Sequence, residues 1–348
     1  MSAQTDIKKI LIIFPGSLGD FIAFLSPLKA VRDKFQSSYI ELICNSDFSE
    51  IAKRGARPDR ISSISQAEIA GLFINPHQCS DKFKNYLCEF DLIISYLDDK
   101  EGTFSGNLRN FSSGTVISTK GNIRKSMKIN LYSHYFSPLR PMGINPSLQN
   151  INLDFAENEL LYGKSLLKSF GYCDKEKIFL IHPGSGSSVK NWKIENYLQL
   201  ADKIRKSCGF KPLFIIGPAE QYLIETIGNK HLLITNVDLL ALSSVMASVS
   251  ANEGAFIGND SGISHLAAAV GLKCYMIFGP TDPERWAPPF NNVTIIRNNT
   301  SKCNGCLPGN IVDCRARECL DSIQPEYVLK IIKTSSIILK EQGNEYLT

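Results

Sequence analysis

Short apolar runs, rich in Ile, Leu and Val, alternate along the chain with longer segments in which apolar residues recur at helical spacing. In the first half these runs are IKKILIIF, IELIC, DLIISYL and TVIS. In the second half they are KIFLIHPG, KPLFIIGP, HLLITN, GAFIGND, CYMIFGP and NVTIIR. Continuous apolar runs separated by helical segments predict parallel strands buried on both faces. Two such series predict an α/β protein with two Rossmann-like, doubly wound parallel-sheet domains.

The boundary between the two domains is predicted after the helical segment ENELLYGKSLLKSFG, residues 157–171. Gly171 suits the C-cap of this helix, and residues 173–177 have the character of a linker. We therefore expect domains at residues 1–173 and 174–348. The second domain ends with a helix in the segment QPEYVLKIIKTSSIILKE.

The composition, 43% apolar and 21% charged residues in a chain of 348, is that of an ordinary globular protein. A net charge of +4 is too small to indicate a nucleic acid partner. No apolar run approaches the roughly 20 residues that span a bilayer, and no cleavage site follows the opening run. We expect a cytoplasmic protein whose ten cysteines are mostly reduced.

An acidic residue, Asp20, follows the first predicted strand in the stretch FPGSLGDFIAF. The glycine spacing of dinucleotide-binding loops is absent from this stretch. Asp20 either caps the following helix or points into a cleft, where it would take a proton from an attacking hydroxyl. The residues alone leave both interpretations open.

Small residues and a lysine follow a second strand in the stretch IHPGSGSSVKNW. Ser185, Gly186 and Ser187 would let backbone N–H groups and hydroxyls approach phosphate oxygens. Lys190 adds a positive charge, although the residue order is not that of a Walker loop. The alternative is an ordinary connection from strand to helix. Glu220, after another strand, would accept hydrogen bonds from ribose hydroxyls.

A third polar strand end lies in the stretch GNDSGISHLAAAVG. Asp260, Ser261 and Gly262 end a buried strand, and His265 lies near the start of the next helix. The carboxyl ends of parallel strands share one edge of a sheet, and helix N-termini favour anions. The segment therefore predicts contact with a negatively charged ligand.

Four of the cysteines form a cluster in the stretch CNGCLPGNIVDCRAREC. Cys303 and Cys306 are separated by two residues, seven residues lead to Cys314, and four more lead to Cys319. This spacing allows four thiolates to wrap one tetrahedral ion. Two disulfides or four free thiols are the alternatives.

Three of these stretches resemble family 9 glycosyltransferases, the ADP-heptose:lipopolysaccharide heptosyltransferase family. They are GSLGDFIAFLSPLKAVR, HPGSGSSVKNW and GNDSGISHLAAAVGLKCYMIFGPTDPERWAPP. The resemblance runs from about Leu11 to about Pro325. It implies a GT-B fold, in which two Rossmann-like domains face each other across a cleft. It also implies an inverting, metal-independent transfer, with acceptor binding by the first domain and binding of a nucleotide-sugar donor by the second.

The resemblance also implies roles for individual residues. Asp20 matches the family's proposed general base, and Lys190 matches the lysine that meets the donor diphosphate. Ser185, Gly186 and Ser187 occupy the position of the family's phosphate loop. The segment Asp260–His265 matches the D-[ST]-G-x-x-H signature that holds the diphosphate and the sugar. For the four cysteines the resemblance leaves a structural zinc or iron ion open, since some members carry such a segment.

An acid-free segment, residues 102–153, supplies the candidate acceptor-binding residues. They are Lys120, Arg124, Lys125, Lys128 and Arg140. These residues form a solvated basic face or recognise an anionic glycolipid, the acceptor class that the resemblance implies. The expected activity is transfer of heptose from ADP-heptose to the lipopolysaccharide inner core, with peripheral contact at the inner membrane. The alternatives are a protein or another glycan as acceptor, another nucleotide sugar, or a non-catalytic nucleotide-sugar-binding protein.

Overall fold

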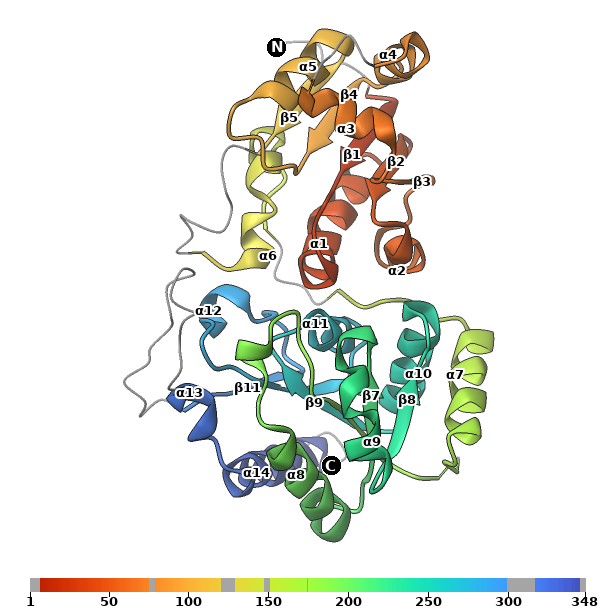
Figure 1. The fold of residues 1–348 in the computed structure, drawn as a ribbon. Helices are drawn as coiled ribbons and strands as arrows, with labels where there is room; N and C mark the ends of the chain where they lie inside the picture. The colour runs from red at the N-terminus through yellow and green to blue at the C-terminus, as the bar shows by residue number, and fades with distance from the viewer. Residues whose placement is uncertain are drawn as a thin grey trace. The chain divides into compact units, whose positions relative to one another are not determined.

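The structure of the chain is a computed structural model that describes residues 7–74, 79–119, 129–146, 151–173, 175–298 and 317–344. The chain divides into two compact units, Met1–Leu153 and Asp154–Thr348 (Figure 1). Each unit contains one parallel sheet, as the two series of apolar runs predict.

Unit 1 contains a five-stranded sheet with the order β3-β2-β1-β4-β5. Its strands are β1 (Lys9–Ile13), β2 (Tyr39–Cys44), β3 (Arg60–Ser63), β4 (Leu92–Ser95) and β5 (Thr115–Ser118). Its α-helices are α1 (Leu18–Lys34), α2 (Ser49–Ala56), α3 (Ala67–Ile74), α4 (Asp81–Cys88), α5 (Thr103–Phe111) and α6 (Leu131–His134). Two 3₁₀ turns, η1 (Ser46–Phe48) and η3 (Ser137–Met142), complete the described part of the unit.

Unit 2 contains a six-stranded sheet with the order β11-β10-β9-β6-β7-β8. Its strands are β6 (Ile178–His182), β7 (Lys211–Ile216), β8 (Leu232–Thr235), β9 (Ala255–Asn259), β10 (Lys273–Ile277) and β11 (Val293–Ile296). Its α-helices are α7 (Glu157–Ser169), α8 (Ile194–Ser207), α9 (Ile224–Gly228), α10 (Leu239–Ala251), α11 (Gly262–Ala269), α12 (Pro283–Trp286), α13 (Glu318–Asp321) and α14 (Pro325–Asn344). The 3₁₀ turns are η4 (Ser188–Lys190) and η5 (Pro218–Leu223).

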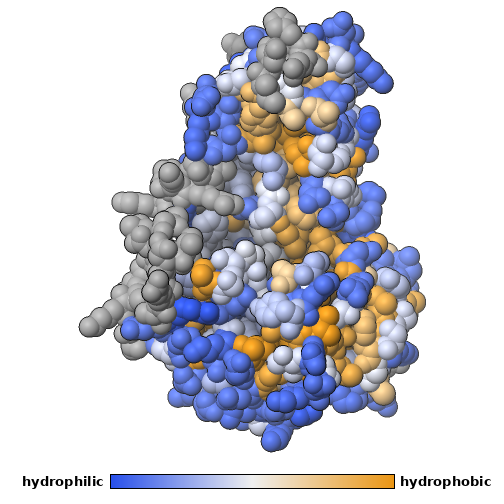
Figure 2. All heavy atoms as spheres, in the orientation of Figure 1, coloured by the Kyte–Doolittle hydropathy of each residue, from blue (hydrophilic) through white to orange (hydrophobic). Residues whose placement is uncertain are grey.

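One face of the unit 2 sheet is covered by α8 and α14, which lie side by side (Figure 1). Tyr197 and Ile204 of α8 pack in one core with Phe179 of β6 and Val328 of α14. Each such side chain stabilises the fold by about 1.5–3 kcal/mol relative to its exposed state. The outer side of α8 is hydrophilic, as Figure 2 shows for the lower edge of the unit, so this helix is amphipathic.

Strand β3 is the one described strand that the apolar runs do not predict. Its sequence, RISS, is short and mostly polar, and all four of its residues are partly or fully exposed. It pairs with β2 alone, at the edge of the unit 1 sheet. An edge strand needs less apolar surface than a central strand, so apolar periodicity gives little signal for it.

Helix α7 belongs to unit 2, so the expected boundary after residue 173 is wrong, and the units divide before this helix. Gly163 of α7 lies so close to α10 that an added Cβ would come within 2.1 Å of the carbonyl oxygen of Ser244. The hydroxyl of Ser248 donates a hydrogen bond to the carbonyl of Leu160 at 2.8 Å. The sequence shows a linker composition after α7, but the packing of α7 on α10 decides the boundary.

The strand order places a topological switch point in each sheet. In unit 1 the order reverses between β1 and β4, and in unit 2 it reverses between β6 and β9. Ligands of doubly wound sheets bind beyond the carboxyl ends of the strands at such a point. The described helices include none with both the length and the apolar character needed to cross a bilayer.

Candidate functional site

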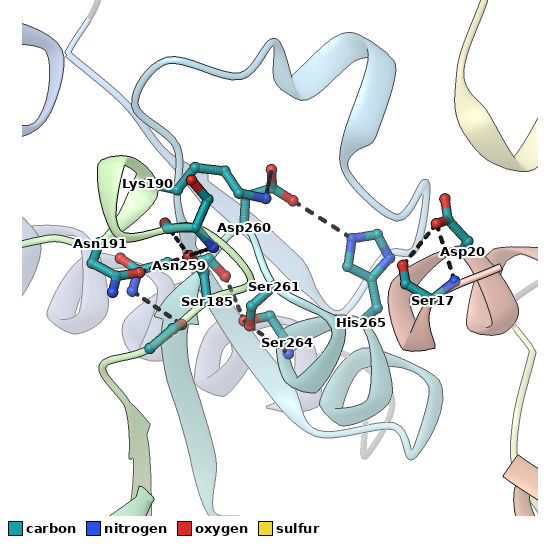
Figure 3. Close-up of polar contacts among 12 residues, drawn as sticks. Ser17, Asp20, Ser185, Lys190, Asn191, Asn259, Asp260, Ser261, Ser264 and His265 are labelled. Carbon is teal, nitrogen blue, oxygen red and sulfur yellow. Dashed lines mark hydrogen bonds and ion pairs between the residues drawn. The ribbon is translucent and has the colours of Figure 1, made fainter. Parts of the chain in front are cut away.

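Two strands of unit 2 end side by side at the switch point, because His182 of β6 is in register with Gly258 of β9. The connection from β6 to α8 and the segment from β9 to α11 therefore leave the sheet at neighbouring positions (Figure 3). These are the two segments in which the sequence predicts anion binding. The sheet brings together residues that lie 70 positions apart in the chain, such as Lys190 and Asp260.

The connection from β6 to α8 contains the predicted small-residue loop. The Ser185 hydroxyl lies 2.7 Å from the carbonyl oxygen of Ser187 and 2.6 Å from Oδ1 of Asn191, and its one proton is available to either acceptor. The backbone N–H of Ser187 donates to the same hydroxyl at 3.3 Å. At Gly186 an added Cβ would meet no atom within 4 Å. The loop is thus held by its own side chains while the backbone at Gly186 stays open to a ligand.

Asp260 is the centre of a small charged network. Its carboxylate is buried, and Oδ2 accepts a hydrogen bond from Lys190 Nζ at 3.1 Å (Figure 3). Nε2 of His265 lies 3.8 Å from Oδ1. Burial by itself raises the pKa of Asp260, but the contacts with His265 and Lys190 lower it to about 2. Asp260 is therefore a fixed anion that holds a lysine and a histidine beside the start of α11.

The start of α11 provides further donors. Ser261 is the N-cap of this helix, and its hydroxyl accepts a hydrogen bond from the N–H of Ser264 at 3.3 Å. The Ser264 hydroxyl donates to the carbonyl of Asn259 at 2.6 Å. Gly262 is the first helical residue, so its N–H has no acceptor within the helix. A helix start with a lysine beside it is suited to bind an anion.

Glu220 lies on η5, directly after β7, and it is buried. Its Oε2 accepts a hydrogen bond from the N–H of Gly217 at 3.1 Å and lies 3.7 Å from Nε2 of His182. Burial by itself raises the pKa of Glu220, but the neighbouring His182 and the Gly217 N–H lower it overall. An added Cβ at Gly184 would come within 2.0 Å of Oε1, so only glycine fits there. The carboxylate thus packs against Gly184 in the connection from β6 to α8, and the predicted ribose contact stays a prediction.

Asn259, the last residue of β9, is a site residue that the sequence reasoning missed. Its Nδ2 donates to the carbonyls of Pro183 at 2.8 Å and Gly184 at 3.3 Å. Its Oδ1 accepts from the N–H of Trp192 at 2.9 Å and from the hydroxyl of Tyr197 at 3.0 Å. One fully buried amide therefore joins both ends of the loop that carries Lys190. The sequence does contain a sign of this role, because Asn259 is a polar residue at the end of the apolar run AFIGN.

Asp20 lies in unit 1, in the first turn of α1, the helix that follows β1 at the switch point. Ser17 is the N-cap and Asp20 is the N3 residue of the capping box, so Asp20 is not the N-cap itself, but its Oδ2 accepts a hydrogen bond from the Ser17 N–H at 3.4 Å. The Ser17 hydroxyl donates to Oδ2 of Asp20 at 2.7 Å (Figure 3). The hydroxyl of Tyr135 donates to Oδ1 at 3.1 Å. Ser17 and Tyr135 thus orient the Asp20 carboxylate, and its role as a base stays a prediction.

The candidate acceptor residues lie mostly outside the described part of the chain. These are Lys120, Arg124, Lys125 and Lys128. Arg140 is described and is exposed on η3 of unit 1. The role of all five residues stays a prediction.

Three of the four clustered cysteines, Cys303, Cys306 and Cys314, also lie outside the described residues. Cys319 is described and is buried on α13. Among the residues that the structure describes, no group of three or more His, Cys, Asp or Glu side chains is arranged to hold a metal ion. The zinc or iron site stays a prediction.

Residues 140–310 match the family model of glycosyltransferase family 9 (heptosyltransferase). A lipooligosaccharide heptosyltransferase 2 of Campylobacter jejuni is 26% identical over 170 residues, which are 47% of this chain and 52% of that protein. The chain thus spans about half the length of the curated relatives it matches.

Two solved structures resemble both units of the chain. A family 9 glycosyltransferase from Veillonella parvula has a TM-score of 0.76 at 19% identity and covers 96% of this chain and 98% of its own. The E. coli ADP-heptose LPS heptosyltransferase II has a TM-score of 0.70 at 17% identity. The match covers 96% of this chain and 99% of that protein's chain. At these identities the likeness concerns the fold, and it confirms the predicted GT-B class. In residues 140–310 the chain is similar to glycosyltransferase family 9 (heptosyltransferase), the family to which the motifs of the sequence also pointed.

Proposed function

We propose that the chain transfers a heptose from ADP-heptose to a sugar of the lipopolysaccharide inner core. The observation that carries this proposal is the network of Lys190, Asp260 and His265 at the switch point of the unit 2 sheet. The network lies within the residues that match family 9. The names of the relatives, a lipooligosaccharide heptosyltransferase 2 and an ADP-heptose LPS heptosyltransferase II, support this choice of donor and acceptor.

In the proposed reaction, unit 2 stabilises the departing diphosphate. As the bond from the anomeric carbon to the β-phosphate oxygen breaks, negative charge collects on ADP. The Lys190 ammonium group and the free N–H groups at the start of α11 are suited to hold that charge. The open backbone at Gly186 allows a phosphate oxygen to approach the loop. These groups provide a way to bind the leaving group without a divalent ion.

Asp20 is the proposed general base. Its carboxylate takes the proton from the acceptor hydroxyl while that oxygen forms a bond to the anomeric carbon. The attack comes from the face opposite ADP, so the configuration at the anomeric carbon inverts. The support for this role is the place of Asp20 after β1 at the switch point of unit 1, and the two hydroxyl contacts that orient its carboxylate.

For the acceptor we propose an anionic glycolipid. The segment between residues 102 and 153 has no acidic residue, which favours an acceptor that carries carboxylates or phosphates. Such a glycolipid would place the enzyme in the cytoplasm, at the inner face of the inner membrane. Replacement of Arg124 and Lys125 by Ala should raise the KM for the acceptor and leave donor binding intact. Weakened donor binding would contradict this assignment.

The decisive experiment is calorimetric binding of ADP, UDP and GDP to the full chain, followed by incubation with ADP-heptose and a lipopolysaccharide-core acceptor. Selective binding of ADP and a heptosylated product support the proposal. Preference for UDP or GDP would mean another nucleotide sugar, and transfer only to a protein would mean another acceptor. Binding of ADP-heptose without turnover on any acceptor would mean a nucleotide-sugar-binding protein.

We also propose a structural metal at the four cysteines. The support is their spacing, which suits one tetrahedral zinc or iron ion. Elemental analysis of the protein purified without a metal-affinity step tests this proposal. One zinc or iron per chain, lost when Cys303 and Cys306 are replaced by Ser, is expected. Absence of both metals from the purified chain would contradict it.

A further inference from the structure

We infer that Tyr135 is a positioning residue for Asp20, and this inference rests on the proposed function. The Tyr135 hydroxyl donates a hydrogen bond to Oδ1 of Asp20 at 3.1 Å, although the two residues lie 115 positions apart. The Ser17 hydroxyl occupies the other oxygen, Oδ2, at 2.7 Å. Each carboxylate oxygen of the proposed base therefore has its own donor, and Tyr135 determines where Oδ1 points.

Tyr135 is itself held rigidly. It is buried directly after α6, and the hydroxyl of Tyr96, which follows β4, donates to its carbonyl oxygen at 3.0 Å. Its ring packs edge-on against Phe14 with 5.3 Å between the ring centroids, and it also contacts Phe24 and Tyr96. The rings of Phe14, Phe24 and Tyr96 thus fix the Tyr135 hydroxyl beside the first turn of α1, which contains Asp20.

This arrangement orients the carboxylate from both sides. Ser17 donates to Oδ2 through its hydroxyl and, at 3.4 Å, through its N–H, whereas Tyr135 donates to Oδ1 from a distant part of the chain. Tyr135 therefore reduces the number of conformations open to the Asp20 side chain. Correct placement of a reacting group accounts for a large part of catalysis.

The test is a double-mutant cycle on the transfer rate with ADP-heptose and lipopolysaccharide core. Tyr135→Phe removes the hydroxyl and keeps the ring, and we expect kcat to fall roughly tenfold with the affinity for ADP unchanged. In an Asp20→Asn background, which lacks the base, the same substitution should cause almost no further loss. A residue that only stabilised unit 1 would lower the rate to the same extent in both backgrounds.

Tyr96→Phe is the matched control. It removes a buried hydroxyl from the same aromatic cluster, but the bond that it removes ends at the carbonyl of Tyr135 and not at Asp20. We expect a loss of thermal stability like that of Tyr135→Phe, with kcat within about twofold of the wild type. Equal losses of kcat in the two variants, or additive losses in the cycle, would overturn the role of Tyr135 alone. A wild-type chain without transfer activity would overturn the proposed function and this inference together.

Discussion

Asp20 and Asp260 occupy similar places in the two units, and their surroundings differ. Each follows a central strand at the switch point of its sheet and lies at the beginning of a helix. Asp260 is buried beside a lysine and a histidine, and its pKa is lowered to about 2. Asp20 accepts hydrogen bonds from the hydroxyls of Ser17 and Tyr135 and from the Ser17 N–H, and its side chain is only partly buried.

The difference shows how one topology can serve two chemical tasks. A carboxylate with cationic partners stays charged and holds those partners in place, as Asp260 holds Lys190. Ser17 and Tyr135 orient the two carboxylate oxygens of Asp20, whose proposed role is that of a base. In the proposed division of roles, the acid of unit 2 organises a site for an anion and the acid of unit 1 takes the proton of the acceptor hydroxyl. Four experiments test this division of roles.

The largest effect is expected from Asp20→Asn. The amide keeps the shape of the side chain but cannot take a proton, so transfer should fall by about 10²–10⁴-fold. The affinity for ADP, measured by calorimetry, should stay the same because the phosphate loop and α11 belong to unit 2. Transfer at the wild-type rate would show that another group is the base. A loss of ADP binding would show that the two carboxylates do not have separate roles.

Lys190→Ala should act on binding instead. Loss of one charge-assisted hydrogen bond costs about 1.5–3 kcal/mol, so the affinity for ADP should fall by about 10- to 100-fold. Binding of adenosine, which has no phosphate, should not change. Lys193→Ala is the control, because Lys193 pairs with Asp321 at 3.1 Å and not with Asp260. Equal losses in both variants would mean that Lys190 acts only through the net charge.

The stability of unit 2 should depend on pH through Asp260. Its pKa is lowered from 3.8 to about 2, so the ionised form stabilises the folded state above pH 4. This contribution, about 2 kcal/mol, should disappear as the pH falls from 4 towards 2. Both tryptophans of the chain, Trp192 and Trp286, lie in unit 2, so their fluorescence reports its unfolding in urea.

Asp260→Asn supplies the comparison for this measurement. The difference in unfolding free energy between the wild type and the variant should be largest near neutral pH and should shrink at low pH. A difference that stays constant across this range would mean that Asp260 stabilises the unit by packing alone. Its ion pair with Lys190 would then contribute little to folding.

The smallest effect is expected from Ser17→Ala, which removes the hydroxyl donor to Asp20 at the N-cap position of α1. Loss of this hydrogen bond costs about 1 kcal/mol of unfolding free energy. Ser80→Ala is a matched control, because Ser80 caps α4 in the same unit through a bond from the N–H of Phe83 at 3.2 Å. Both variants should lose similar stability in thermal unfolding. Only Ser17→Ala should slow the transfer reaction. Equal transfer rates in the Ser17→Ala and Ser80→Ala variants would mean that the Ser17 hydroxyl is not needed to orient Asp20.

Much of the fold follows from local sequence. Buried parallel strands need continuous apolar runs, and every described strand except β3 coincides with such a run. The polar residues that follow β6 and β9 also differ clearly from those apolar runs, so the sequence predicts the position of the candidate site. The boundary at residue 173 was wrong because Gly163 and Ser248 join α7 to α10, a contact that the composition of α7 does not show.

The sequence by itself determined which residues could carry chemistry. Each candidate polar residue follows a predicted strand, and its type and its place after that strand are given by the sequence alone. These residues are Asp20, Lys190, Asp260 and His265. Only the tertiary structure decided which of these residues meet and what surrounds them. The contacts of Asn259 with the phosphate loop and of Tyr135 with Asp20 join distant parts of the chain. Such contacts depend on the order of the strands and on side-chain packing, and the period of apolar residues encodes neither.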